Sequence, residues 1–288
     1  MEIIHNVSLM QKRAEELRSA GKKIGFVPTM GFFHEGHLEL MRVARRNADV
    51  LVVSIFVNPI QFGPSEDYDR YPKDIERDKK KAQEVGVDIL FLPSVEEMYP
   101  DGFQTKVHVE KLTQHLCGLF RPGHFDGVTT VVTKLFNIVK PHVAVFGEKD
   151  YQQLLVIKRM VKDLNMDIHI IGVPIVRESD GLAMSSRNVY LSPEERKSAL
   201  CLKKSIDLAI EMVKKGESDA SLIKRKVKEL INSHPFTKIQ YVSICDPETL
   251  EEVDQIKDRA LIALAVFVGN ARLIDNAILE KTKKGDEI

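Results

Sequence analysis

The chain has 288 residues, 43% hydrophobic and 29% charged, which is enough apolar material for one large or two ordinary domains. Its 42 basic and 42 acidic residues balance, so no overall field would attract nucleic acid or an anionic membrane. With three cysteines in no framework spacing, no signal peptide and no apolar run of about 18 residues, we expect a cytoplasmic protein that acts on small molecules and contacts no membrane.

Strand and helix patterns alternate through the first 175 residues. Apolar runs predict strands at 23–29, 49–57, 88–92, 142–146 and 167–173. Helical spacing of apolar residues predicts helices at 7–20, 36–47, 73–85, 127–139 and 149–164. The alternation predicts an α/β fold with a doubly wound, Rossmann-like parallel sheet, in which ligands lie at the carboxyl ends of the strands.

The pattern changes near residue 174. Beyond this point we expect charged amphipathic helices and short antiparallel strands, at 193–215, 219–232, 238–245, 260–268 and 271–275. The sequence therefore predicts a Rossmann-like domain at 1–175 and a smaller α+β domain at 176–288.

The most informative segment runs from the first long strand into a helix that starts near His34, Gly36 and His37. A helix N-terminus binds phosphate, and histidines three residues apart share one helix face. Gly36 would let a flat nucleobase approach the backbone. Zinc sites on helices more often space histidines four apart with a third ligand, and the cysteines form no cluster, so nucleotide binding is favoured over a metal site.

Further polar residues follow the strand 142–146. Gly147 permits a tight turn, Lys149 offers a point charge to phosphate, and Gln153 lies one helical turn beyond Lys149 on the same face. Asp150 is either a helix cap or a nucleotide ligand.

Two more polar groups are candidates for ligand contact. Gln61 follows the strand 49–57 and suits a hydroxyl or carboxylate, although a turn residue beside a proline would also explain it. The hydroxyls and guanidinium of Ser185, Ser186 and Arg187 form a cradle for phosphate oxygens, in a loop that would otherwise be solvated polar surface. This loop could close over a substrate.

Five motifs in order, PTMGFFHEGH, FVNPIQFG, RPGHFDGV, FGEKDYQQ and DGLAMSSRN, resemble those of the pantoate–β-alanine ligase family. That family lies in the HxGH nucleotidylyltransferase-like (HUP) superfamily. The motifs cover roughly residues 1–200, and the remaining third fits the family's smaller domain by length and pattern. The resemblance implies a cytoplasmic, homodimeric, AMP-forming ligase that joins pantoate and β-alanine through an amide bond. ATP, with Mg²⁺, would first convert pantoate to a pantoyl adenylate and release pyrophosphate, on the route to coenzyme A.

The resemblance also implies site residues. Catalytic roles would fall to His34, His37, Lys149, Ser185, Ser186 and Arg187, with His37 as proton donor toward pyrophosphate. ATP would contact Met30, Gly31, Phe32, Phe33, His34, Glu35, Gly36, His37, Gly147, Glu148, Lys149, Asp150, Val176, Met184, Ser185, Ser186 and Arg187. Gln61 would contact pantoate and β-alanine, and Gln153 pantoate, in a pocket with Asn58, Val131 and Val132. Protein ligands for Mg²⁺ are unknown, and the domain 176–288 would act as a lid that excludes water.

Other functions stay open from the residues alone. A nucleotidylyltransferase would share the histidines but need basic residues for a phosphorylated acceptor, where Gln61 and Gln153 are uncharged. A non-catalytic nucleotide sensor could dispense with the histidines, Lys149 or the Ser-Ser-Arg loop. An aminoacyl-tRNA synthetase is disfavoured because the chain is short and has no basic appendage.

Overall fold

The computed structural model describes residues 1–64 and 66–281, which form two compact units. No helix within these residues has the length and apolar character that crossing a membrane requires. The roles predicted for the two domains, binding of ATP and pantoate by 1–175 and a lid for 176–288, stay predictions. Residues 282–288 of the second domain lie outside the described part.

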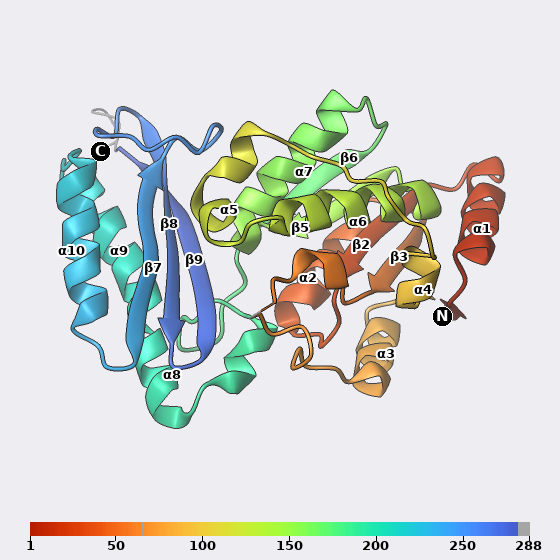
Figure 1. Ribbon diagram of the computed structural model, residues 1–288, viewed down its shortest axis with the longest axis horizontal. Helices are drawn as coiled ribbons and strands as arrows, with labels where there is room; N and C mark the ends of the chain where they lie inside the picture. Colours follow the sequence, from red (N-terminus) through yellow and green to blue (C-terminus); the bar gives the residue numbers. More distant parts are fainter. Residues whose placement is uncertain (65, 282–288) are drawn as a thin grey trace. The chain divides into compact units, whose positions relative to one another are not determined.

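The larger unit, Met1–Thr113 with Phe120–Val176, is built on a six-stranded sheet whose paired strands are all parallel (Figure 1). The spatial order of its strands is β1 (Glu2–Ile4), β4 (Ile89–Phe91), β3 (Val50–Ile55), β2 (Ile24–Thr29), β5 (Val143–Gly147) and β6 (His169–Val173). From β2 the chain runs outward through β3 and β4 on one side, and through β5 and β6 on the other. The switch point of the sheet therefore lies between β2 and β5, where ligands of such sheets bind.

Helices cover this sheet. They are α1 (Val7–Ser19), α2 (Glu35–Arg46), α3 (Ile75–Glu84), α4 (Val95–Met98), α6 (His124–Val139) and α7 (Tyr151–Asp163). Helix α2 packs against β2, β3 and β5, and its buried Leu38, Met41 and Ala44 recur at helical spacing. Strand β3 (VLVVSI) is buried along nearly its whole length, as expected of a strand covered on both faces. The predicted doubly wound sheet is confirmed.

Two local elements of the larger unit differ from the prediction. The edge strand Glu2–Ile4 was not expected, since a three-residue strand is too short to show a period. Helix α7 begins at Tyr151 because Glu148–Asp150 form a separate 3₁₀ turn. Lys149 lies in this turn and Gln153 in α7, so the prediction that both lie on one α-helical face was wrong.

The smaller unit comprises Gln114–Leu119 and the chain from Arg177 onward. Its antiparallel sheet has the order β7 (Thr237–Cys245), β8 (Arg259–Val268) and β9 (Ala271–Glu280). The helices of this part of the chain are α5 (Leu116–Phe120), α8 (Pro193–Ala199), α9 (Cys201–Lys214) and α10 (Ala220–Asn232). The predicted helix 193–215 is divided at Leu200 into α8, which packs against β8, and α9, which packs mainly against β9.

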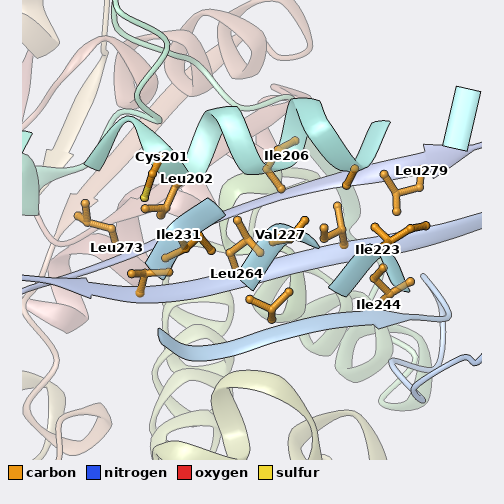
Figure 2. Packing of buried hydrophobic residues seen from close by; sticks show 14 of the residues in the cluster. Cys201, Leu202, Ile206, Ile223, Val227, Ile231, Ile244, Leu264, Leu273 and Leu279 are labelled. Atoms are coloured by element: carbon orange, nitrogen blue, oxygen red, sulfur yellow. The ribbon is translucent and has the colours of Figure 1, made fainter. Parts of the chain in front are cut away.

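Apolar faces of α9 and α10 form the core of this unit with the sheet. Figure 2 shows side chains of the two helices and the strands meeting in one layer, namely Cys201, Leu202, Ile206, Ile223, Val227, Ile231, Ile244, Leu264, Leu273 and Leu279. The spacing of four between Ile223, Val227 and Ile231 places all three on one face of α10. The predicted small antiparallel sheet is confirmed, with β9 running further than residue 275.

Candidate active site

The turn after β2 has a backbone that few residue types adopt. Gly31 has φ +86° and Phe32 has φ +54°. A Cβ atom on Gly31 would lie 2.8 Å from Ile55 Cγ2 and 3.0 Å from Asp78 Oδ2, so both space and conformation require glycine there. The turn delivers His34 to the N-cap position of α2, at the carboxyl end of the central strand.

A buried aspartate of α3 holds this turn. Asp78 Oδ2 accepts the backbone N–H of Phe32, and Oδ1 accepts that of Phe33, each at 2.6 Å. Burial raises the pKa of Asp78, while the two N–H bonds favour its ionised form. On the same helix, Lys81 Nζ donates to the Phe33 carbonyl at 2.8 Å. Asp78 was not predicted from the sequence because its helix is highly charged. The signal that could have indicated a buried side chain was its spacing of four residues from Ala82, which is also buried.

The two histidines lie together, as predicted. Their ring centroids are 4.0 Å apart, with 31° between the planes. The backbone N–H of His34 donates to His37 Nδ1 at 3.3 Å, so neutral His37 carries its proton on Nε2. Burial, then the charges of His34, Lys149 and Lys81, hold the pKa of His37 well below its usual value. His37 is therefore neutral at pH 7 and presents an Nε2–H donor.

The turn after β5 brings a second charge to this edge. Lys149 Nζ lies 3.8 Å from Asp150 Oδ2, with a fifth of the lysine side chain exposed. Asp150 occupies the N-cap position of α7, but its side chain makes no capping hydrogen bond. Gly147 has φ −83°, and a Cβ there would meet no atom within 4 Å. Gly147 permits this turn, as predicted, but neither its backbone conformation nor the space around it requires a glycine.

Gln61 lies beside the end of β2. Its Nε2 donates to Met30 Sδ at 3.4 Å, and its Oε1 accepts from Asn58 Nδ2 at 3.0 Å. A Cβ atom on Gly127 of α6 would lie 2.6 Å from Gln61 Cα, so the helix backbone packs directly on the turn that carries Gln61. This close contact is possible because Gly127 has no side chain. Helix α6 begins at His124, three residues before the predicted start, so Gly127 lies in its first turn.

A buried network supports the backbone of the same turn. Arg121 Nη1 donates to His124 Nε2 at 3.0 Å, which leaves the proton of neutral His124 on Nδ1, from where it donates to the Gln61 carbonyl at 2.8 Å. Burial, followed by the charge of Arg121, lowers the pKa of His124 to about 4. Arg121 also binds both carboxylate oxygens of Glu66, at 2.7 and 2.5 Å. Sequence reasoning placed Arg121 and His124 in a motif without a role.

A cavity of about 210 Å³ opens where the chain leaves β2, β3 and β4. Its lining includes Met30, Gly31 and Phe32 from the predicted nucleotide site, together with Asp78 and Lys73. The cavity therefore lies at the edge of the sheet, next to the turn that leads to His34.

The remaining predicted residues of this unit have different surroundings. Val131 and Val132 are buried in α6 and contribute to the core. Gln153 is half-buried on α7, while its neighbour Gln152 is buried and donates to the Leu112 carbonyl at 2.8 Å. Contact of Gln153, Val131 and Val132 with substrate stays a prediction.

The Ser-Ser-Arg loop of the smaller unit is ordered by local hydrogen bonds. The Ser185 hydroxyl accepts the backbone N–H of Arg187 at 3.2 Å, and Ser186 is buried. Asn188 Nδ2 donates to Glu178 Oε1 at 2.7 Å and to the Ala183 carbonyl at 3.1 Å. The loop therefore has a defined conformation, and its contact with ATP stays a prediction.

Within residues 1–64 and 66–281, no three His, Cys, Asp or Glu side chains are grouped so that they could hold a metal ion. This part of the chain thus offers no cage for Mg²⁺, which commonly binds through substrate phosphates and water.

Fold and site together define a class. A doubly wound parallel sheet with a His-x-Gly-His segment opening a helix at the carboxyl end of its central strand is the architecture of the HxGH nucleotide-binding proteins.

Comparison with known proteins gives the family. The family model described as pantoate-beta-alanine ligase matches residues 2–278. Pantothenate synthetase of Thermotoga petrophila is 60% identical over 279 residues, covering 97% of this chain and all of the relative. The crystal structure of pantothenate synthetase from Thermus thermophilus has a TM-score of 0.90 at 50% identity, covering 96% of this chain and 99% of the other. Pantoate-beta-alanine ligase from Francisella tularensis, complexed with beta-gamma ATP and beta-alanine, has a TM-score of 0.81 at 35% identity, covering 98% and 99%.

The chain belongs to the pantoate–β-alanine ligase family. The reaction of this family is the ATP-dependent condensation of pantoate with β-alanine to pantothenate, so the predicted enzyme class is confirmed.

Proposed function

We propose that the residues at the carboxyl ends of β2 and β5 carry out this condensation through a pantoyl adenylate bound beside His34 and His37. The observation that carries the proposal is the bond from the His34 N–H to His37 Nδ1. It leaves the His37 Nε2–H as a donor at the start of α2, where unpaired backbone N–H groups also favour phosphate.

The reaction proceeds in two displacements. A carboxylate oxygen of pantoate bonds to the α-phosphorus of ATP, and the bond from this phosphorus to the bridging oxygen breaks, which releases pyrophosphate. The amine of β-alanine then bonds to the carbonyl carbon of the adenylate, loses a proton, and displaces AMP. Negative charge builds on phosphate oxygens in the first step, and a donor already held in place there is worth about 10²–10³ in rate.

The protonation state of His37 gives it two successive roles. The free protein holds the ring neutral, so Nε2–H first acts as a hydrogen-bond donor. Phosphate anions beside the ring favour the imidazolium and raise its pKa. To carry this charge, His37 takes up a proton at Nδ1 and gives up the bond from the His34 N–H, after which its Nε2 proton can pass to the departing pyrophosphate.

Other residues would bind the substrates. Lys149 supplies a positive charge to the phosphates, joined by Ser185, Ser186 and Arg187 of the smaller unit. The amides of Gln61 and Gln153, with Asn58 and the valines 131 and 132, would bind pantoate, with Gln61 also near β-alanine. The smaller unit would act as the lid that protects the adenylate from water. Support for the roles of the polar residues comes from the family motifs that carry them.

Three further features belong to the proposal. Mg²⁺ would arrive with the phosphates of ATP, in keeping with the lack of a grouped ligand set among the described residues. The chain would form a homodimer, as the resemblance implies. A cytoplasmic location is supported by three cysteines that are free thiols in the described structure.

The test is pantoate-dependent exchange of labelled pyrophosphate into ATP, with β-alanine left out. Exchange that requires pantoate would demonstrate reversible adenylate formation. A folded protein that binds ATP but shows no such exchange would contradict the proposal.

A further inference from the structure

Tyr99, which the sequence analysis did not single out, begins a relay of hydrogen bonds that ends on Gln61. The Tyr99 hydroxyl donates to Asn58 Oδ1 at 2.7 Å. Asn58 Nδ2 donates in turn to Gln61 Oε1 at 3.0 Å and to the Gly127 carbonyl at 3.1 Å. Asn58 is only 1% exposed, so its polar atoms depend on these three partners.

The partners fix the direction of every bond in the relay. The Gly127 carbonyl can only accept, so the Asn58 atom facing it must be the amide nitrogen. The second N–H of that nitrogen must meet an acceptor, so Gln61 turns its oxygen toward Asn58. The Gln61 NH₂ group is left on the other side, against the weak acceptor Met30 Sδ at 3.4 Å. Gln61 therefore offers its NH₂ group as a donor to a ligand on that side.

Neighbouring side chains pack around the Tyr99 ring and fix the position of its hydroxyl. Its ring contacts those of Phe56 and Phe103, with centroids 6.1 and 5.0 Å away, and Lys134 Nζ lies 5.8 Å from its centroid. Burial raises the pKa of Tyr99, so the hydroxyl keeps its proton throughout the neutral range. The Tyr99 hydroxyl can therefore donate to Asn58 Oδ1 throughout the neutral pH range.

We infer that Tyr99 is a positioning residue for substrate selection, which acts through Asn58 to hold the Gln61 NH₂ group toward an oxygen of the acid substrate. The inference rests on the proposed function, in which Gln61 binds pantoate. Loss of the hydroxyl leaves Asn58 Oδ1 buried without a donor, and a buried unpaired acceptor is costly enough to drive the asparagine out of its conformation. The Gln61 amide then loses the partner that orients it.

The variant Tyr99→Phe isolates the hydroxyl because it keeps the ring and its contacts. In pantoate-dependent exchange we expect the KM for pantoate to rise about tenfold, which corresponds to one disturbed hydrogen bond. The KM for ATP should stay within about twofold. The control Phe103→Leu removes one ring contact and keeps the hydroxyl, so it should lower Tm and leave both KM values unchanged.

A double-mutant cycle shows whether Tyr99 acts through Gln61. In a Gln61→Ala background, Tyr99→Phe should change the KM for pantoate no further, since the group it orients is gone. Equal effects of Tyr99→Phe in both backgrounds would overturn the inference, as would an unchanged KM for pantoate in the single variant. Absence of pantoate-dependent exchange in the unmodified protein would instead contradict the proposed function itself. If Tyr99→Phe fails to fold, Asn58→Asp removes the donor to Gln61 Oε1 at the next member of the relay. Its rise in the KM for pantoate should then disappear in the Gln61→Ala background, and a rise that persists there would overturn the inference.

Discussion

The backbone N–H of Phe33 donates to Asp78 Oδ1 at 2.6 Å, which ties helix α3 to the residue directly before His34. The second oxygen of the carboxylate binds Phe32, whose φ of +54° is rarely adopted by a residue with a side chain. Backbone in this region persists only where the surroundings hold it. The conformation at the start of α2 therefore depends on a carboxylate that lies 45 residues further along the chain.

The variant Asp78→Asn should lower the rate of pyrophosphate exchange by about 10²-fold, the effect expected when a preorganised donor is misplaced. The amide can accept one N–H, but its NH₂ faces the other, so one buried N–H loses its partner and about 1–3 kcal/mol of stability with it. Exchange kinetics and thermal unfolding measure the two effects.

Asp74→Asn provides the matched control on the same helix. Asp74 caps α3 by accepting the Arg77 N–H, and asparagine caps helices equally well. Both rate and stability should stay close to those of the unmodified protein. An Asp78→Asn protein as active as this control would refute the dependence of the histidine turn on Asp78.

Gly127 and Gly147 differ in how closely other atoms approach them. Gly127→Ala would place Cβ 2.6 Å from Gln61 Cα and from the Ile60 carbonyl, backbone atoms that cannot move aside cheaply. We expect a loss of about 1–3 kcal/mol, as in other overpacked sites. Gly147→Ala has open space and φ −83°, and should be neutral or stabilising by up to about 1 kcal/mol.

Urea unfolding of both variants gives the comparison. Similar stability losses for the two would mean that helix α6 does not press on the Gln61 turn as the structure indicates.

Much of the larger unit follows from the sequence because its signals are local. The apolar run 49–57 and the periodic helix 36–47 each carry their own pattern, and strand alternation with helices fixes the parallel sheet. The pairing of His34 with His37 was equally readable, since spacing of three places two side chains together at a helix start.

The groups that hold the site in place could not be predicted from the sequence. Asp78, Tyr99 and His124 all act on residues more than 40 positions away, so nothing in the neighbouring sequence distinguishes them from a solvated acid, a loop aromatic and a turn histidine. The sequence likewise does not distinguish Gly127 from Gly147. Both stand in family motifs, yet only the first meets backbone atoms that exclude a side chain.

Substitutions at His37 test whether the ring is chiefly a hydrogen-bond donor. Asparagine reaches the Nδ1 position and can accept the His34 N–H, but it has no group at Nε2. Glutamine can place an NH₂ near Nε2. We expect His37→Asn to lower pyrophosphate exchange by about 10²–10³. His37→Gln should retain roughly tenfold more activity than His37→Asn, because it restores one donor of about 1.4 kcal/mol.

Single-turnover adenylate formation is the appropriate measurement, since it excludes product release. Equal losses in the two variants would count against the donor role and leave proton transfer as the contribution of His37.

His124 should make stability depend on pH below neutrality. Its pKa is about 4 in the folded protein and near 6.5 when unfolded, so between these values the unfolded state binds more protons. Stability from this group is complete above pH 6.5 and is lost as the pH falls toward 4, by up to about 3 kcal/mol. The variant His124→Asn can still donate to the Gln61 carbonyl but has no imidazole to titrate. The stability advantage of the unmodified protein over this variant should therefore shrink steadily between pH 6.5 and 4 in urea unfolding, whereas an advantage that stays constant would show that His124 is not held neutral by Arg121 and its burial.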